Sequence, residues 1–200
     1  MEKIIKALKS RNMNGYFVNN KEEALQKALG LIEKDKKICF GGSATLQQMG
    51  ILDKLRKDKY KLIEREDISS FYTKHFLLKN ASTDGIYLSG TNAITEDGKI
   101  INIDGWGNRV NAINYGPEKV IVVVGKNKVV KNIDEGIKRI SEKAAPPNTK
   151  RLNHNTPCAK TGKCEDCRSQ ERICNILSIV QFQRDPNRIH VIIVNEELGY

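Results

Sequence analysis

The feature that most constrains the fold of this chain is the stretch KVIVVV at residues 119–124, in which every residue after Lys119 is β-branched. A strand of this composition is typical of the interior of a parallel sheet, where both faces are covered. Shorter apolar runs lie at residues 37–40 and 86–88, and amphipathic stretches separate all three. This alternation predicts an α/β fold with a mostly parallel sheet and helices on both faces.

Two of the amphipathic stretches begin with paired capping residues. Asn20 is followed three positions later by Glu23, and Asn132 is followed by Glu135. Each pair predicts a helix start, because both side chains satisfy backbone N–H groups of the first turn. The helix after Asn132 is expected to run until Pro146-Pro147 stops it.

Further elements are expected in the remaining stretches. A helix is predicted from residue 69 or 70 through residue 78, with His75 as a packed or surface histidine. Residues 176–182 and 189–194 have strand composition, and the turn signal Asp185-Pro186-Asn187 separates them. These two strands are expected to return to the sheet as an edge hairpin.

Length and charge limit the classes of protein. The 200 residues predict a single domain over 1–200, and no apolar stretch reaches the length of a membrane span, so a cytoplasmic location is expected. The formal net charge is +10, but Lys and Arg alternate with Glu and Asp on helix faces. Since no basic stripe contains interleaved aromatics, nucleic-acid binding is disfavoured and an anionic small molecule is the expected ligand.

A glycine-rich loop, Gly41-Gly42-Ser43-Ala44-Thr45, joins the strand at 37–40 to a helix predicted over 46–57. Backbone N–H groups in such a loop, at a helix N-terminus, suit an anion such as phosphate. The loop lacks the lysine of a P-loop and the third glycine of a dinucleotide fingerprint, so no NAD or flavin motif is present. The alternative is a plain turn in which a hydroxyl caps the helix. The predicted ligand-binding residues of this loop are Gly41, Gly42, Ser43 and Thr45.

Residues 84–110 combine strand-like runs with many Gly, Asn, Asp and Thr residues. Glu96-Asp97-Gly98 predicts a tight turn, and Asp104 begins a glycine-containing loop. Asp104 is the first candidate for a general base or nucleophile and Glu96 the second, whereas the alternative is ordinary turn chemistry. Further ligand-binding residues predicted in this stretch are Asn92, Asn108 and Arg109.

Four of the five cysteines lie close together in a polar stretch, residues 148–175, which is expected to be an insertion. Their C-x5-C-x2-C-x6-C spacing is neither that of a zinc ribbon nor that of a bacterial ferredoxin. We expect one metal centre, either an iron–sulfur cluster or zinc, with His154 as a possible substitute ligand. The alternatives are reduced thiols or a redox pair of Cys164 and Cys167, and the remaining Cys39 is expected to be a core thiol. The predicted metal ligands are Cys158, Cys164, Cys167 and Cys174.

Six blocks in order along the chain resemble the LUD-domain family of lactate utilisation proteins, in its short stand-alone form. The blocks are GGSATLQQMGI, SGTNAITEDGKIINIDGWGNRV, GPEKVIVVVGKNKVV, AAPPNTKRL, PCAKTGKCEDC with RICN, and VNEELGY. The resemblance implies a fold similar to that of sugar-phosphate isomerases, CoA-transferases and folate cyclo-ligases. In that fold the glycine-rich loop contributes to the ligand pocket.

The resemblance also implies a function, because the family is associated with oxidation of lactate to pyruvate by a multi-protein iron–sulfur system. We therefore expect a component of such a system, working with an iron–sulfur partner protein. One alternative is a non-redox isomerase, transferase or cyclo-ligase acting on a phosphorylated or acyl substrate. Another is a metal-stabilised regulatory or scaffold protein.

Overall fold

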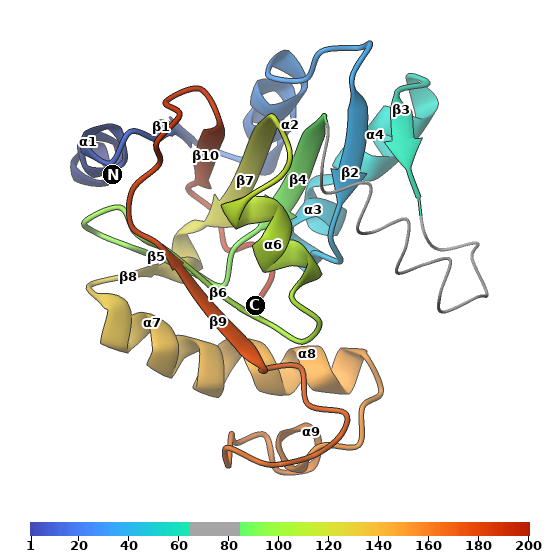
Figure 1. Ribbon diagram of the computed structural model, residues 1–200, viewed down its shortest axis with the longest axis vertical. Coiled ribbons are helices and arrows are strands. Elements are labelled where there is room, and N and C mark those ends of the chain that lie inside the picture. Colours follow the sequence, from blue (N-terminus) through green and yellow to red (C-terminus); the bar gives the residue numbers. More distant parts are fainter. Residues whose placement is uncertain (65–84) are drawn as a thin grey trace.

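The computed structural model describes residues 1–64 and 85–200. Its centre is a six-stranded sheet in the order β1-β10-β7-β4-β2-β3, in which every neighbouring pair is parallel (Figure 1). The α/β fold with a mostly parallel sheet is thereby confirmed. The strands are β1 (Asn14–Val18), β2 (Lys37–Phe40), β3 (Lys61–Ile63), β4 (Ile86–Gly90), β7 (Lys119–Gly125) and β10 (Ile189–Val194).

The sheet has helices on both faces, as predicted. One face packs against α2 (Lys21–Gly30), α3 (Ala44–Met49) and α4 (Ile51–Lys57). The other face packs against α1 (Glu2–Ser10) and α6 (Asn108–Asn114). β7 supplies side chains to both cores, because Val120, Val122 and Val124 face one way while Ile121 and Val123 face the other.

A second, smaller sheet was not anticipated from the sequence. It contains β8 (Val129–Val130), β5 (Ala93–Thr95), β6 (Ile100–Asp104) and β9 (Ile176–Val180), in that order. β5 and β6 form an antiparallel hairpin, and the predicted turn between them is present, since the amide of Gly98 donates to the carbonyl of Thr95 at 2.8 Å. One face of this sheet joins the core under the central sheet. The other face packs against α7 (Ile133–Arg139) and the π-helix that follows it (Ile140–Ala144).

Both predicted helix caps are confirmed. The side chain of Asn20 accepts a hydrogen bond from the amide of Glu23 at 2.8 Å, and Asn132 accepts one from Glu135 at 3.0 Å. In each case the glutamate accepts from the residue before the cap, with the amide of Asn19 and of Lys131 as donors. These reciprocal contacts satisfy amides that the helix itself leaves unpaired.

The prediction that Pro146 and Pro147 end the helix after Asn132 is wrong. The backbone passes through the π-helix and continues as α8 (Ala145–Arg151), and α9 (Pro157–Thr161) follows (Figure 1). The prolines lie in the first turn of α8, where a missing N–H removes no α-helical bond and the fixed φ is compatible with a helix. The π-helix lies between α7 and α8, directly before the prolines, and it separates the two α-helical segments.

The expected edge hairpin of residues 176–182 and 189–194 is also wrong. β9 pairs with β6 in the second sheet, whereas β10 lies between β1 and β7 in the central sheet. All six residues of β10 are buried, so this strand needs neighbours on both sides and helices on both faces. β9 keeps Ile176 and Leu177 exposed, which fits an edge position.

The helix predicted over residues 46–57 is divided in two. Gly50 ends α3 with φ +71° and ψ 16°, and α4 begins at the next residue. Glycine adopts this left-handed conformation without strain and is the usual residue after a helix end. The predicted helix from residue 69 or 70 to 78, with His75, lies outside the described residues. No helix among those residues combines the length and apolar composition needed to cross a membrane.

The left-handed conformation of Gly50 gives a stability prediction. Gly50→Ala should lower the free energy of unfolding by about 1–2 kcal/mol, because an L-residue is disfavoured at this φ. No atom within 4 Å would meet the added Cβ, so the cost isolates the backbone conformation. Gly30→Ala is the matched control in equally open space without a positive φ, and it should be neutral or stabilising. Equal urea midpoints for the two variants would contradict this explanation.

Candidate functional site

The loops after the central strands converge at one edge of the sheet. Because all six strands are parallel, their carboxyl ends share this edge, and the register places Phe40 beside Leu88, Gly90 beside Val123 and Gly125 beside Val194. Open α/β sheets bind ligands at this edge. The glycine-rich loop after β2 and the loops after β4, β7 and β10 therefore form the region in which a site is expected.

Lys128 is the most unusual residue in this region. It lies just after β7, at the end of a short 3₁₀ turn (Lys126–Lys128), and only 4% of it is exposed. Its ammonium donates a hydrogen bond to the hydroxyl of Thr45 at 2.8 Å, and that hydroxyl donates to the carbonyl of Leu198 at 3.3 Å. A lysine is almost never fully buried without a charged partner, so this position needs a functional or structural reason.

Two arginines lie near Lys128, and Asn92 bridges them. The side-chain oxygen of Asn92 accepts from the guanidinium of Arg109 at 3.0 Å, and its backbone carbonyl accepts from Arg139 at 2.7 Å. Arg139 also donates to the carbonyl of Asn127 at 3.0 Å, and Arg109 donates to the carbonyl of Ile103. We refer to Lys128, Arg109 and Arg139, together with Thr45 and Asn92, as the basic site.

The basic site carries positive charge without an acidic partner. Among the described residues, no carboxylate forms an ion pair with any of its three cationic side chains, whose acceptors are carbonyl, amide and hydroxyl oxygens. Burial, together with the charges of Arg139 and Arg109, lowers the pKa of Lys128 from 10.5 to about 7. Burial also lowers the pKa of Arg139. Buried charge of one sign is costly, and an anion would offset that cost.

The structure places the glycine-rich loop beside the basic site. Ser43 caps α3 by accepting from the amide of Leu46 at 3.3 Å, which is the alternative considered for this loop. Thr45 is buried and bonded to Lys128, while Gly41 is buried, with Cδ of Arg109 3.8 Å from where a Cβ would lie. Because α3 has only six residues, its dipole alone is a weak anion attractant, and the neighbouring cations carry the argument.

The segment after β10 closes one side of the basic site. Asn127 holds this segment in place, because it accepts from the amide of Leu198 at 3.2 Å and donates to the carbonyl of Gly199 at 3.2 Å. A Cβ on Gly199 would lie 2.6 Å from the hydroxyl of Thr45 and 2.9 Å from the ammonium of Lys128. The backbone therefore approaches the site more closely than any residue with a side chain would permit.

The two candidate carboxylates lie at different ends of the β5–β6 hairpin. The carboxylate of Asp104 accepts from the amides of Gly105 at 3.1 Å, Arg109 at 2.9 Å and Val110 at 3.3 Å, so it caps the start of α6. In this way Asp104 positions Arg109, and half-buried Asn108 begins the same helix. Glu96 lies in the hairpin turn, where it pairs with Lys3 at 3.0 Å. Of the two, Asp104 adjoins the basic site through Arg109.

The cysteine segment, residues 157–175, follows α8, and its helix α9 lies on the side of α8 away from both sheets (Figure 1). Its C-terminal end returns to the second sheet, where the amide of Asn175 donates to the carbonyl of Asp104 at 3.0 Å. Cys158 is buried and near the hydroxyls of Thr149 and Thr156, with sulfur–oxygen distances of 3.5 and 3.3 Å. Burial raises the pKa of Cys174, and the charges of Cys164 and Cys167 raise it as well. Arg172 lowers this pKa, but by less than burial raises it. Cys164 and Cys167 thus lie close enough to Cys174 to affect its pKa, while Cys158 contacts Thr149 and Thr156.

Arg172 holds this segment together. Its guanidinium donates to the carbonyls of Cys167 and Cys174 and to the carboxylate of Asp166. Within residues 1–64 and 85–200, no set of three or more His, Cys, Asp or Glu side chains is arranged to hold a metal ion, so the thiols as placed do not fit a shared centre. His154 contacts the carbonyl of Glu171 through its Nδ1 at 2.7 Å. Cys39 is buried in the core, as predicted.

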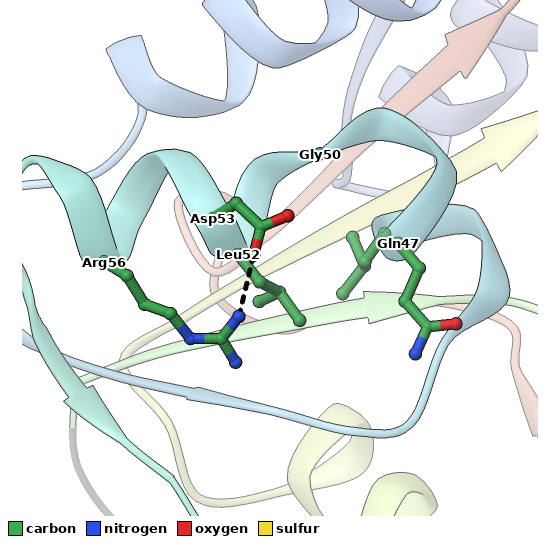
Figure 2. A pocket seen from close by; sticks show the side chains of 6 residues that line it. Gln47, Gly50, Leu52, Asp53 and Arg56 are labelled. Carbon is green, nitrogen blue, oxygen red and sulfur yellow. Dashed lines mark hydrogen bonds and ion pairs between the residues drawn. The ribbon is translucent and has the colours of Figure 1, made fainter.

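A separate hollow of about 200 Å³ lies where α3 meets α4. Figure 2 shows its two charged side chains, Asp53 and Arg56, joined by an ion pair of 2.9 Å, with Gln47 on the neighbouring helix. A hollow whose charged groups pair with each other offers little to a charged ligand. We therefore place the candidate site at the carboxyl edge of the central sheet.

Fold and site together define an open α/β protein with a basic site at the carboxyl edge of its parallel sheet. The family model described as the LUD domain matches residues 1–194, and the chain belongs to this family. The resemblance noted in the sequence is thus confirmed, and the family groups the chain with lactate-utilisation-type proteins in general.

A solved structure supports the fold. A DUF162 family protein from Deinococcus radiodurans matches with a TM-score of 0.53 and 16% sequence identity, and the match covers 97% of this chain and 95% of that chain. At this identity the likeness concerns the fold alone. Comparison with the curated proteins found no match.

Sequence reasoning missed Lys128, Arg139 and Asn127. Asn127 and Lys128 lie two and three residues after the end of β7, so the rule that ligands bind at carboxyl ends of parallel strands was a usable signal. Arg139 had no such signal, because it lies in a helix whose packing against the second sheet buries it. Arg109 and Asn92 were predicted, and the structure joins them by a hydrogen bond.

The lowered pKa of Lys128 gives a stability prediction with a defined sign. Between about pH 7 and 10.5 the folded protein binds fewer protons at Lys128 than the unfolded chain does, so the free energy of unfolding rises with pH across this window. Lys128→Met removes this dependence. The variant should be more stable than wild type at pH 7, and the difference should shrink as the pH approaches 10.

Urea unfolding at pH 7, 8.5 and 9.5 measures the effect. Lys126→Met, at an exposed lysine two residues away, is the control and should follow wild type at each pH. A stability difference between Lys128→Met and wild type that stays constant with pH would contradict the lowered pKa.

Proposed function

We propose that this protein is a cytosolic LUD-domain component of an iron–sulfur redox system for lactate or related organic acids, and that its basic site binds the organic-acid anion. The observation that carries the proposal is the group of three cationic side chains, Lys128, Arg109 and Arg139. No carboxylate of the described residues forms an ion pair with any of them. A bound anion would compensate a positive charge that no carboxylate of residues 1–64 and 85–200 pairs with.

The chemistry of these side chains supports a carboxylate. Guanidinium groups offer parallel N–H donors that match the two oxygens of a carboxylate, and Asn92 holds two such groups in a defined relation. The hydroxyl of Thr45 and the ammonium of Lys128 can then bond an oxygen outside the carboxylate, namely the hydroxyl or carbonyl oxygen on the adjacent carbon of a small organic acid. The glycine-rich loop, Gly41 to Thr45, supplies the adjoining backbone.

Oxidation of such an acid requires an acceptor for two electrons. The sequence offers no nicotinamide or flavin fingerprint, so the electrons would pass to a partner, which we propose is an iron–sulfur protein. We propose the cysteine segment as the part of this chain that takes a metal, either a cluster or zinc. Its thiols would have to move from their described positions, since Cys158 faces Thr149 and Thr156.

Asp104 and Glu96 remain our candidates for proton transfer, in that order. The contacts of Asp104 with the amides of α6 support a role in positioning Arg109, and a proton acceptor at this place would have to exchange one of those bonds. Glu96 is paired with Lys3 in the hairpin turn, away from Arg109, which supports its second rank.

A second candidate function has support from the same observation. Three cations without a carboxylate also suit a phosphate, which carries more charge than a carboxylate. A non-redox isomerase, transferase or cyclo-ligase acting on a phosphorylated or acyl substrate would use the site in this way. The ligand preference of the site separates the two candidates.

Isothermal titration calorimetry of the full chain with lactate, pyruvate and inorganic phosphate tests the anion site. We expect at least one of these three anions to bind. Arg139→Gln should weaken the affinity for that anion by about 10- to 100-fold, because one charge-assisted hydrogen bond is lost. Lys126→Gln removes an exposed positive charge nearby and should change affinity by less than about threefold.

Preference for lactate or pyruvate favours the organic-acid function, and preference for phosphate favours the second candidate. If none of the three binds, or if Lys126→Gln weakens binding as much as Arg139→Gln does, the basic site is not the anion site. A wild-type melting temperature in each variant confirms that the fold is intact.

The metal proposal for the cysteine segment has its own test. After anaerobic purification, metal analysis and a visible spectrum should show either iron with broad absorption or colourless zinc. Single Ser substitutions at Cys164, Cys167 and Cys174 should each lower the metal content, and so should Cys158→Ser. The matched control is Cys39→Ser, which should keep the metal because Cys39 lies in the core. Full occupancy in two or more of the first four variants would reject a shared site.

A further inference from the structure

The ammonium of Lys128 has a hydrogen-bonding arrangement that suits a neutral amine. Its one described partner is the hydroxyl of Thr45 at 2.8 Å. That hydroxyl gives its own hydrogen to the carbonyl of Leu198, so Lys128 is the donor and Thr45 the acceptor. When Lys128 is neutral, this bond uses an N–H and leaves the nitrogen lone pair unshared.

The surroundings favour that neutral form. Lys128 is 4% exposed, and the charged groups that act on it are the guanidiniums of Arg139 and Arg109, both of the same sign. Both effects lower its pKa, to about 7, so a large part of the population carries a free amine at neutral pH. A lysine that is desolvated and lies next to another cation is the usual form of a nucleophilic amine.

The neighbouring groups define what such an amine would meet. Arg109 and Arg139 are suited to a carboxylate, and the bridge through Asn92 keeps them together. Residues 198 and 199 lie against the amine on another side, since a Cβ on Gly199 would be 2.9 Å from it. That segment limits the access of water, which would otherwise hydrolyse a product formed there.

We propose that Lys128 is a catalytic nucleophile that forms an imine with the carbonyl carbon of a small oxo acid, whose carboxylate pairs with Arg109 and Arg139. This inference rests on the proposed anion site and adds a covalent step to it. The nitrogen lone pair forms the new C–N bond while the carbonyl π bond breaks. Two protons from the amine, relayed to the oxygen, then allow it to leave as water, and the C=N bond remains. No oxidant or reductant is required.

Borohydride trapping on the wild-type full chain tests the step directly. The protein is incubated with pyruvate, reduced with sodium borohydride and examined by intact mass and peptide mapping. We expect one adduct per chain, with the mass of pyruvate less one oxygen atom, on the peptide that contains Lys128. Acetone lacks the carboxylate and should label Lys128 less by about tenfold or more.

Two variants complete the experiment. Lys128→Arg keeps a positive charge but has no nucleophilic amine at neutral pH, so it should lose the adduct. Lys126→Arg changes the exposed neighbour and should keep the adduct on Lys128. Absence of any adduct in wild type, or labelling spread over surface lysines at equal rates with acetone, overturns the proposal.

Binding of lactate, which has a hydroxyl group in place of the keto group and cannot form an imine, separates this inference from the proposed function. If calorimetry detects lactate or pyruvate but trapping fails, Lys128 is an electrostatic group and the anion site stands. If lactate, pyruvate and phosphate all fail to bind and trapping fails, both proposals fall; if phosphate alone binds, the anion site stands and the imine proposal falls. An adduct on Lys128 in wild type, abolished in Lys128→Arg at an unchanged melting temperature, supports the covalent role.

Discussion

Parallel pairing of β7 with β10 and β4 is the constraint on which the rest of the structure depends. These three strands are buried on both faces, so helices must cover both sides and crossover connections must return each strand in the same direction. All carboxyl ends then meet at one edge. The loops that carry Thr45, Asn92 and Lys128 are neighbours for that reason, although they are far apart in sequence.

The same arrangement explains the electrostatics of the basic site. Lys128 lies in the turn after β7 and is covered by the segment after β10, so its amine loses most of its hydration. Helix α6, which follows β6 of the second sheet, contributes Arg109, and α7 packed on that sheet contributes Arg139. Three separate packing interactions thus place like charges together. Such an arrangement is costly for folding alone, which is why we connect it with binding.

Local chemistry was predictable where the residues involved are near one another in the chain. The caps at Asn20 and Asn132 and the turn at Gly98 depend on side chains and amides within a few positions, so their patterns identify them. The prolines after the π-helix were misjudged because one change in helix geometry moved them into a first turn. β9 and β10 were paired wrongly because adjacency in sequence favours a hairpin, whereas burial of every β10 residue required an interior position.

The sequence by itself determined the α/β class, the family and the approximate edge of the sheet at which a ligand would bind, because these follow from strand composition and from short glycine and asparagine patterns. Only the tertiary structure decided which side chains face that edge. Arg139 reaches it through helix packing, and Asp104 is drawn into capping α6 rather than left free. The pKa of Lys128 is likewise a tertiary property, because burial and two arginines from other elements lower it. No local sequence pattern encodes the distance of those arginines from Lys128.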